Sequence, residues 1–152
     1  MKNLKLLLVD DEEEFVKALA ERLKMRDLES DTVYDGEQAL SFVESKEPDV
    51  MVLDLKMPGI DGIEVLERVK KAYPKIEVII LTGHGTEKDE ERAKRLGAFD
   101  YLEKPVDIDT LVARLKKAFG RKMDKASAAA TFAEAGEHET AREILKEETE
   151  KD

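Results

Sequence analysis

The sequence predicts an α/β fold in which five parallel strands form a doubly wound sheet that is covered by helices on both faces. Short apolar runs alternate with amphipathic segments five times, and the connections between them are short. The clearest run, Val50–Leu53, is apolar throughout, which is typical of a parallel strand buried on both faces. With 152 residues and 41% hydrophobic content, the chain can form one such domain with an ordinary core.

The strands are expected where the apolar runs lie. Their segments are 4–9, 29–34, 50–53, 76–81 and 99–102. The segment 29–34 alternates only weakly between apolar and polar residues, so we expect it at an edge of the sheet.

Helix starts are marked by side chains that can cap free backbone N–H groups. The capping pairs are Asp35 with Gln38, Asp61 with Glu64, and Thr86 with Asp89. The segment 87–96 offers only Ala93 and Leu96 to a core, so we expect a weakly anchored helix that can move. Gly97 should end that helix, and Asp107 should open the last one, which carries Leu111, Val112, Leu115 and Ala118 at helical spacing.

The chain is expected to divide at residue 121 into a folded domain, 1–121, and an acidic extension, 122–152, that is helical or partly disordered. From Met123 onward nine acidic residues stand against four basic ones. Gly136 could separate two short helices that carry Phe132 on one side and Ile144 and Leu145 on the other. Such a pair cannot bury its own apolar face, so docking on the domain, pairing with a second copy, binding a partner and mobility are all left open.

Charge and composition exclude several classes of function. The net charge of −10 argues against binding nucleic acid or anionic membranes, and we expect no DNA-binding domain. The chain has no cysteine, and therefore no disulfide and no thiolate metal site. No signal peptide and no apolar run of about 20 residues is present, so a soluble, cytoplasmic protein is expected.

Four strand ends carry polar side chains: Asp10 and Asp11, Asp54, Thr82, and Lys104. In a parallel sheet these strand ends share one edge, where α/β proteins bind ligands. Carboxylates about 5 Å apart repel by about 3 kcal/mol at an effective dielectric constant near 20, so a cation or a proton must accompany them. A site with only oxygen ligands suits Mg²⁺, with Asp10 and Asp11 as its holders.

Carboxylates, a hard divalent ion, an ammonium group and a hydroxyl group together indicate phosphoryl transfer. Asp54 is the expected nucleophile because it follows the central strand and would form an acyl phosphate. Lys104 and the ion would spread the charge of the transferred group, and Thr82 would donate a hydrogen bond.

These residues resemble a known family over roughly residues 5–119. Asp10-Asp11, Asp54 with Met57-Pro58-Gly59 and Asp61-Gly62, Thr82, and Lys104-Pro105 look like the receiver domain of two-component response regulators. The resemblance implies a flavodoxin-like sheet in the order 2-1-3-4-5. It implies phosphorylation of Asp54 by a sensor histidine kinase or phosphotransfer protein. It also implies Mg²⁺ held by Asp11, Asp54 and the carbonyl of Lys56 with Asp10 nearby, and a cis peptide before Pro105.

The same resemblance implies a phosphorelay switch that acts through protein–protein contacts. Thr82 would move toward the phosphoryl group, Tyr101 would swing inward behind it, and the surface around residues 87–102 would change. Lys56 and His84 are candidate modulators of the phosphorylated lifetime, because they could flank the phosphoryl group. The downstream target and the pairing of two copies are left open. Residues 82–85 look most like receivers of transcription activators, but no ATPase or DNA-binding domain is expected to follow.

Two other functions are considered. An aspartyl-phosphate phosphatase acting on outside substrates uses the same strand-end groups, but such enzymes usually carry a second acid two residues after the nucleophile, and Lys56 stands there. We therefore expect only self-phosphorylation and autodephosphorylation, not an enzyme. A flavin-binding protein of similar topology would need donor-rich loops at the strand ends, whereas these loops are acidic.

Overall fold

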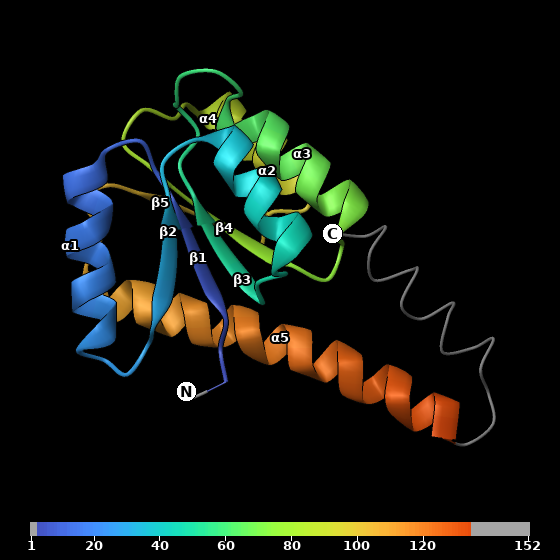
Figure 1. The fold of residues 1–152 in the computed structure, drawn as a ribbon. Helices are drawn as coiled ribbons and strands as arrows, with labels where there is room; N and C mark the ends of the chain where they lie inside the picture. Colours follow the sequence, from blue (N-terminus) through green and yellow to red (C-terminus); the bar gives the residue numbers. More distant parts are fainter. Residues whose placement is uncertain (1–2, 135–152) are drawn as a thin grey trace.

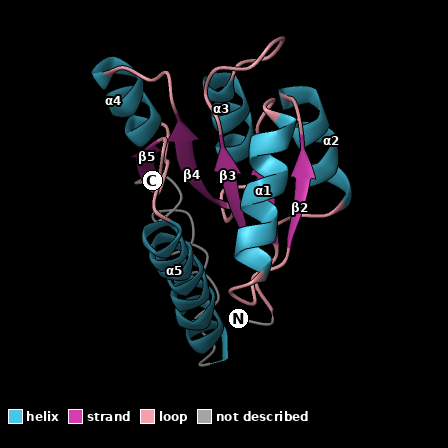
Figure 2. Cartoon of the chain, turned by 90° about the vertical axis from the view of Figure 1, so that its left-hand side faces the viewer, coloured by secondary structure: helices cyan, strands magenta, loops and turns pink. Residues whose placement is uncertain are grey.

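The computed structural model describes residues 3–134 and contains one five-stranded sheet. The strands are β1 (Leu6–Val9), β2 (Ser30–Val33), β3 (Val50–Leu53), β4 (Glu77–Thr82) and β5 (Asp100–Glu103). All neighbouring pairs are parallel, in the order β2-β1-β3-β4-β5, and Figure 2 shows strand arrows pointing to the same end. The predicted fold class and strand order are confirmed, and β2 lies at an edge as expected.

Five helices cover the two faces of this sheet. They are α1 (Glu13–Lys24), α2 (Gly36–Ser45), α3 (Gly62–Ala72), α4 (Glu87–Arg95) and α5 (Ile108–Glu134). Apolar residues of α1 and α5 share one core with the sheet, and those of α2, α3 and α4 share the other (Figure 1). Within the described part of the chain, no helix combines the length and apolarity that crossing a membrane requires.

The predicted helix caps are present. Asp35 accepts a hydrogen bond from the N–H of Gln38 at 2.7 Å, and Asp61 accepts one from that of Glu64 at 2.9 Å. Thr86 and Asp89 form a reciprocal capping box at the start of α4. These side chains fix where the helices begin, and with them the strand-end loops that precede α2, α3 and α4.

Helix α4 is anchored as weakly as its sequence predicts. Ala93 is its buried residue, and Leu96, just beyond its end, is half-buried. Gly97 follows with a φ of 102°, a left-handed conformation that glycine adopts without strain. A helix with so small an apolar contact can shift on its neighbours at low cost.

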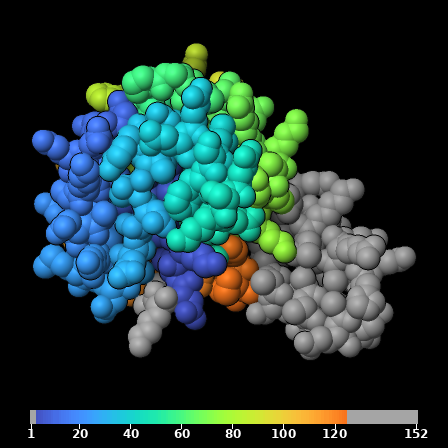
Figure 3. Space-filling view, in the orientation of Figure 1, coloured from blue at the N-terminus to red at the C-terminus, as the bar shows by residue number. Residues whose placement is uncertain are grey.

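Helix α5 extends past residue 121, where the folded domain was expected to end. The expected boundary between residues 121 and 122 falls inside this helix, which runs unbroken to Glu134. Arg121 reaches the buried Glu77 at 3.8 Å, and Lys122 pairs with Asp49 at 2.5 Å, so α5 is fixed to the edge where the strands begin. Figure 1 shows α5 projecting past the sheet, and Figure 3 shows it (orange) reaching the surface below α2 (cyan). The expected break at Gly136, with Ile144 and Leu145, lies outside the described residues.

Candidate functional site

The carboxyl ends of the strands bring Asp54, Asp10 and Lys104 together. Asp54 directly follows β3, its N–H donates to the carbonyl of Val9 at 3.0 Å, and it is 2% exposed. A Cβ at Gly62 would lie 2.2 Å from the carbonyl oxygen of Asp54, so only glycine lets α3 begin this close to the site. The backbone therefore fixes the position of the expected nucleophile, and the surrounding residues bury it almost completely.

Lys104 provides the positive charge of the site. Its Nζ lies 2.7 Å from Asp10 Oδ2, 2.9 Å from Glu12 Oε1 and 3.9 Å from Asp54 Oδ2. The ring of Phe15, on α1, lies 4.3 Å from the same nitrogen. The backbone N–H of Lys104 donates to the carbonyl of Thr82 at 3.0 Å, and the peptide between Lys104 and Pro105 is cis, as predicted.

Burial and the neighbouring charges shift the pKa values of the ionisable groups in this cluster. Burial raises the pKa of Asp10, although the hydrogen bond from Lys104 opposes that shift. The hydrogen bond from Lys104 lowers the pKa of the exposed Glu12. Burial favours the neutral amine of Lys104, but the hydrogen bonds to Asp10 and Glu12, together with the negative charges of Asp10 and Asp54, outweigh burial and raise the pKa of Lys104. Lys104 is thus held as an ammonium ion.

The acids that meet here are not quite those that the sequence singled out. Among the described residues, Asp10, Glu12 and Asp54 place carboxylate oxygens within 4.8 Å of one another. Asp11 is exposed and lies outside this group, so its role as a metal ligand stays a prediction. Glu12 was not among the residues predicted for the site. Its position two residues after Asp10 was the signal that could have indicated it.

The donor set fits a hard divalent cation. Asp54 Oδ1 is buried and has no hydrogen-bond partner in the structure, so one oxygen of the central carboxylate is free to bind a ligand. The neighbouring acids offer only oxygen atoms, which Mg²⁺ prefers. Ligation through the carbonyl of Lys56 stays a prediction.

Thr82 and Tyr101 lie together behind the site. Thr82 is fully buried, and its Oγ1 accepts a hydrogen bond from the backbone N–H of His84 at 3.4 Å. Tyr101 is 8% exposed and points inward beneath Gly85, because a Cβ at Gly85 would lie 1.5 Å from its hydroxyl oxygen. The side chains expected to act as switches are therefore neighbours.

Lys56 reaches from the loop after β3 to the start of α4. Its Nζ lies 3.7 Å from Asp89 Oδ2, in the residue that closes the α4 capping box. The backbone hydrogen bond from Thr86 is the main cause that lowers the pKa of Asp89, and Lys56 adds to it. This pair connects the loop of the expected nucleophile to the weakly anchored helix.

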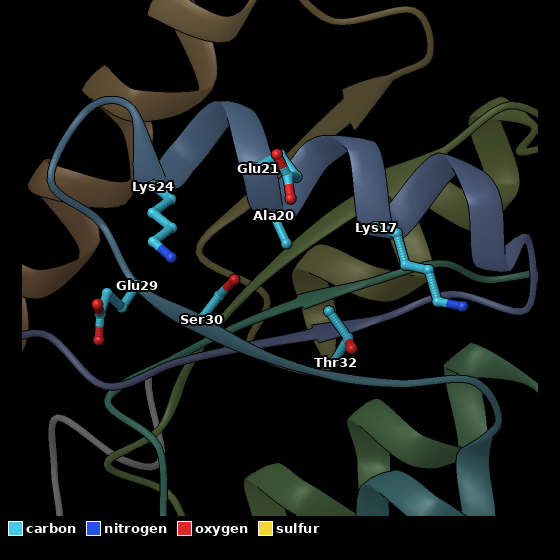
Figure 4. Close-up of a pocket in the computed structure, with 7 residues that line it drawn as sticks. All are labelled: Lys17, Ala20, Glu21, Lys24, Glu29, Ser30 and Thr32. Carbon is cyan, nitrogen blue, oxygen red and sulfur yellow. The ribbon is translucent and has the colours of Figure 1, made fainter.

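A groove of about 510 Å³ lies away from this site, between α1 and the edge strand β2 (Figure 4). Its lining residues are Lys17, Ala20, Glu21, Lys24, Glu29, Ser30 and Thr32. Two basic and two acidic side chains balance each other there, and none of the strand-end residues lines it. The groove therefore has no part in the expected chemistry.

The chain is similar in sequence to a known protein family and to several known proteins. Residues 6–116 match the family model described as the response regulator receiver domain. The chain is 40% identical over 120 residues to a protein named as an NtrX-like response regulator in Rickettsia typhi, and 39% identical over 110 residues to the DNA-binding transcriptional regulator NtrC of Escherichia coli. These matches cover 78% and 72% of this chain, but only 25% and 24% of those proteins, so the chain spans about a quarter of their length.

A solved structure shows the same relationship. The response regulator receiver domain protein from Clostridium thermocellum is 34% identical, with a TM-score of 0.75. The match covers 79% of this chain and 97% of that one.

Proposed function

The chain belongs to the response regulator receiver domain family, which serves phosphorelay signalling in two-component systems, and we propose that its phosphoacceptor is Asp54. The observation that carries this proposal is the geometry at the end of β3. A buried carboxylate with one free oxygen lies 3.9 Å from a lysine that is held as an ammonium ion. That pairing supplies a nucleophile and a counter-charge for the incoming phosphoryl group.

In the proposed reaction an oxygen of Asp54 attacks the phosphorus of a phosphohistidine on a sensor kinase or phosphotransfer protein. The new P–O bond forms as the P–N bond breaks, and the electron pair of that bond stays on the imidazole nitrogen. Lys104 donates to an oxygen of the transferred group, and the Thr82 hydroxyl would move to do the same. The product is an acyl phosphate on Asp54.

Magnesium is the cofactor in this proposal. Asp10, Asp11, Asp54 and the carbonyl of Lys56 would hold it, and the bound ion would neutralise charge that develops on the phosphoryl oxygens. Two carboxylates of this set, Asp10 and Asp54, are already close together in the structure.

The output of the proposed switch passes through the surface around residues 87–102. Tyr101 lies beside Thr82 at the edge of this surface, and α4 has only a small apolar anchor. A phosphoryl group adds strong acceptors that could draw Thr82 toward the site and change that surface. The downstream partner in this proposal is a protein, and the cytoplasmic location expected from the sequence belongs to the same proposal.

The test is to incubate the chain with phosphoramidate and Mg²⁺ and to measure its mass. A single adduct of about 80 Da is expected, since one acyl phosphate forms. Reduction with borohydride converts an aspartyl phosphate to homoserine, so peptide mapping should find homoserine at residue 54. A modified residue elsewhere would refute the assignment of Asp54. If the chain instead hydrolyses varied phosphate esters with rapid turnover, it is a phosphatase that acts on outside substrates. A switch would show only its own phosphorylation and dephosphorylation.

Lys56 and His84 are proposed to slow hydrolysis of the acyl phosphate by limiting the approach of water. Lys56→Ala should increase the rate of dephosphorylation by about two- to five-fold, because its side chain reaches across from the β3 loop to α4. His84→Ala should act in the same direction. The rates are measured by loss of the mass adduct after the phosphodonor is removed.

The matched control is Lys75→Ala, an exposed lysine in the loop before β4. It removes the same charge at the opposite edge of the sheet and should leave the rate unchanged. If Lys56→Ala and Lys75→Ala behave alike, the proposed shielding role is wrong.

A further inference from the structure

We propose that Glu12 is a positioning residue that holds Lys104 for the phosphoryl transfer. This inference deepens the proposed function and rests on it. The metal-binding and catalytic roles proposed above do not include the Glu12 side chain. Yet that side chain makes one of the two shortest contacts of the Lys104 ammonium.

Glu12 contacts both charged partners of Asp54. Its backbone N–H donates to Asp10 Oδ1 at 2.9 Å, and its carboxylate accepts from Lys104 Nζ at 2.9 Å. Asp10 Oδ2 accepts from the same nitrogen at 2.7 Å. One residue at the start of α1 thus fixes the position of an acid through its backbone and of an ammonium group through its side chain.

The side chain of Glu12 has no competing role in the fold. It stands at the N-cap position of α1 but makes no side-chain capping hydrogen bond. It is also more than half exposed, with 58% of its side chain accessible. Removing the carboxylate should therefore leave the helix and the core intact.

The contact matters because lysine is a flexible four-carbon chain with three donors on one nitrogen. Asp10 and Glu12 take two of those donors, which leaves one for a group on Asp54 at 3.9 Å. Asp10 is also an expected metal ligand, so its carboxylate would have to bind both Mg²⁺ and Lys104. Glu12 is then the carboxylate that is free to keep Lys104 in place, and the ring of Phe15 contacts the same ammonium group.

The first test needs no metal and no phosphodonor. Lys104 is labelled with an amine-acylating reagent in EDTA, and its modification is quantified by peptide mass spectrometry. Glu12→Ala should raise the labelling rate of Lys104 by about three- to five-fold, since the partly exposed ion pair that restrains it is lost. Glu14→Ala, which removes one exposed charge from the same helix, should leave the rate unchanged. Equal rates in the wild type and Glu12→Ala would overturn the proposal.

The second test separates positioning from metal binding. At saturating Mg²⁺, Glu12→Ala should phosphorylate about three- to five-fold more slowly than the wild type, because Lys104 is still poorly held. If saturating Mg²⁺ restores the wild-type rate and only the Mg²⁺ dependence shifts, Glu12 acts as a metal ligand and the positioning role is wrong. Absence of an adduct on the wild type would refute the proposed function, while the labelling result would still decide whether Glu12 restrains Lys104.

Discussion

Asp54→Asn is expected to abolish phosphoryl incorporation at residue 54 and to raise the melting temperature of the chain. The amide cannot act as the nucleophile, so the acyl phosphate cannot form. Stability should rise because Asp54 is 2% exposed and carries a buried oxygen without a hydrogen-bond partner, next to the carboxylate of Asp10. A buried amide costs less than a buried carboxylate, and its N–H can face Asp10.

The expected gain is about 1 to 3 kcal/mol, the usual cost of an unsatisfied buried group. The attraction between Asp54 and Lys104 is lost, but Lys104 keeps its two closer partners, Asp10 and Glu12. Thermal unfolding in EDTA measures the effect without any divalent cation. Asp124→Asn, at an exposed position of α5, removes one negative charge and should change the melting temperature little. A less stable Asp54→Asn variant would show that the carboxylate is satisfied by contacts other than those described.

The fold was predictable because local signals and burial agreed. Val50–Leu53 is apolar without alternation and is buried throughout, as a central parallel strand must be. The capping box of Thr86 and Asp89 fixed the start of α4 even though that helix has almost no apolar face. The length of α5 was not predictable in the same way, because residues past 118 lack the regular apolar spacing. Its ion pairs to Glu77 and Asp49 depend on tertiary contacts that no local pattern contains.

The site was predictable as far as strand ends alone determine it. Asp10, Asp54 and Lys104 meet, with Thr82 at the same edge, because parallel strands end at a common edge. Side-chain direction within a loop does not follow from strand order. Glu12 was therefore not predicted as a site residue although its carboxylate contacts Lys104. Asp11 is exposed, and its role as a metal ligand stays a prediction.

Gly85→Ala is expected to drive Tyr101 out of its buried position and to destabilise the chain by about 2 kcal/mol, the cost of exposing a large apolar side chain. A Cβ at residue 85 would lie 1.5 Å from the Tyr101 hydroxyl oxygen and 3.0 Å from Thr82 Cγ2. Both atoms cannot be accommodated, so the tyrosine must move. Because burial raises the pKa of Tyr101, its displacement should lower that pKa toward the value of a free phenol.

A double-mutant cycle separates this clash from any general effect of the substitution. In a Tyr101→Ala background the new methyl group has room, so Gly85→Ala should cost less than about 0.5 kcal/mol. Gly120→Ala on α5 is the matched control: its added methyl group meets no atom within 4 Å, and it should stabilise the helix slightly. If the cost of Gly85→Ala were the same with and without Tyr101, the tyrosine would not be what the glycine accommodates. If the two are coupled as expected, Gly85 is what allows Tyr101 to point inward beside Thr82. In the proposed switch, the inward position of Tyr101 would then depend on the absence of a side chain at residue 85.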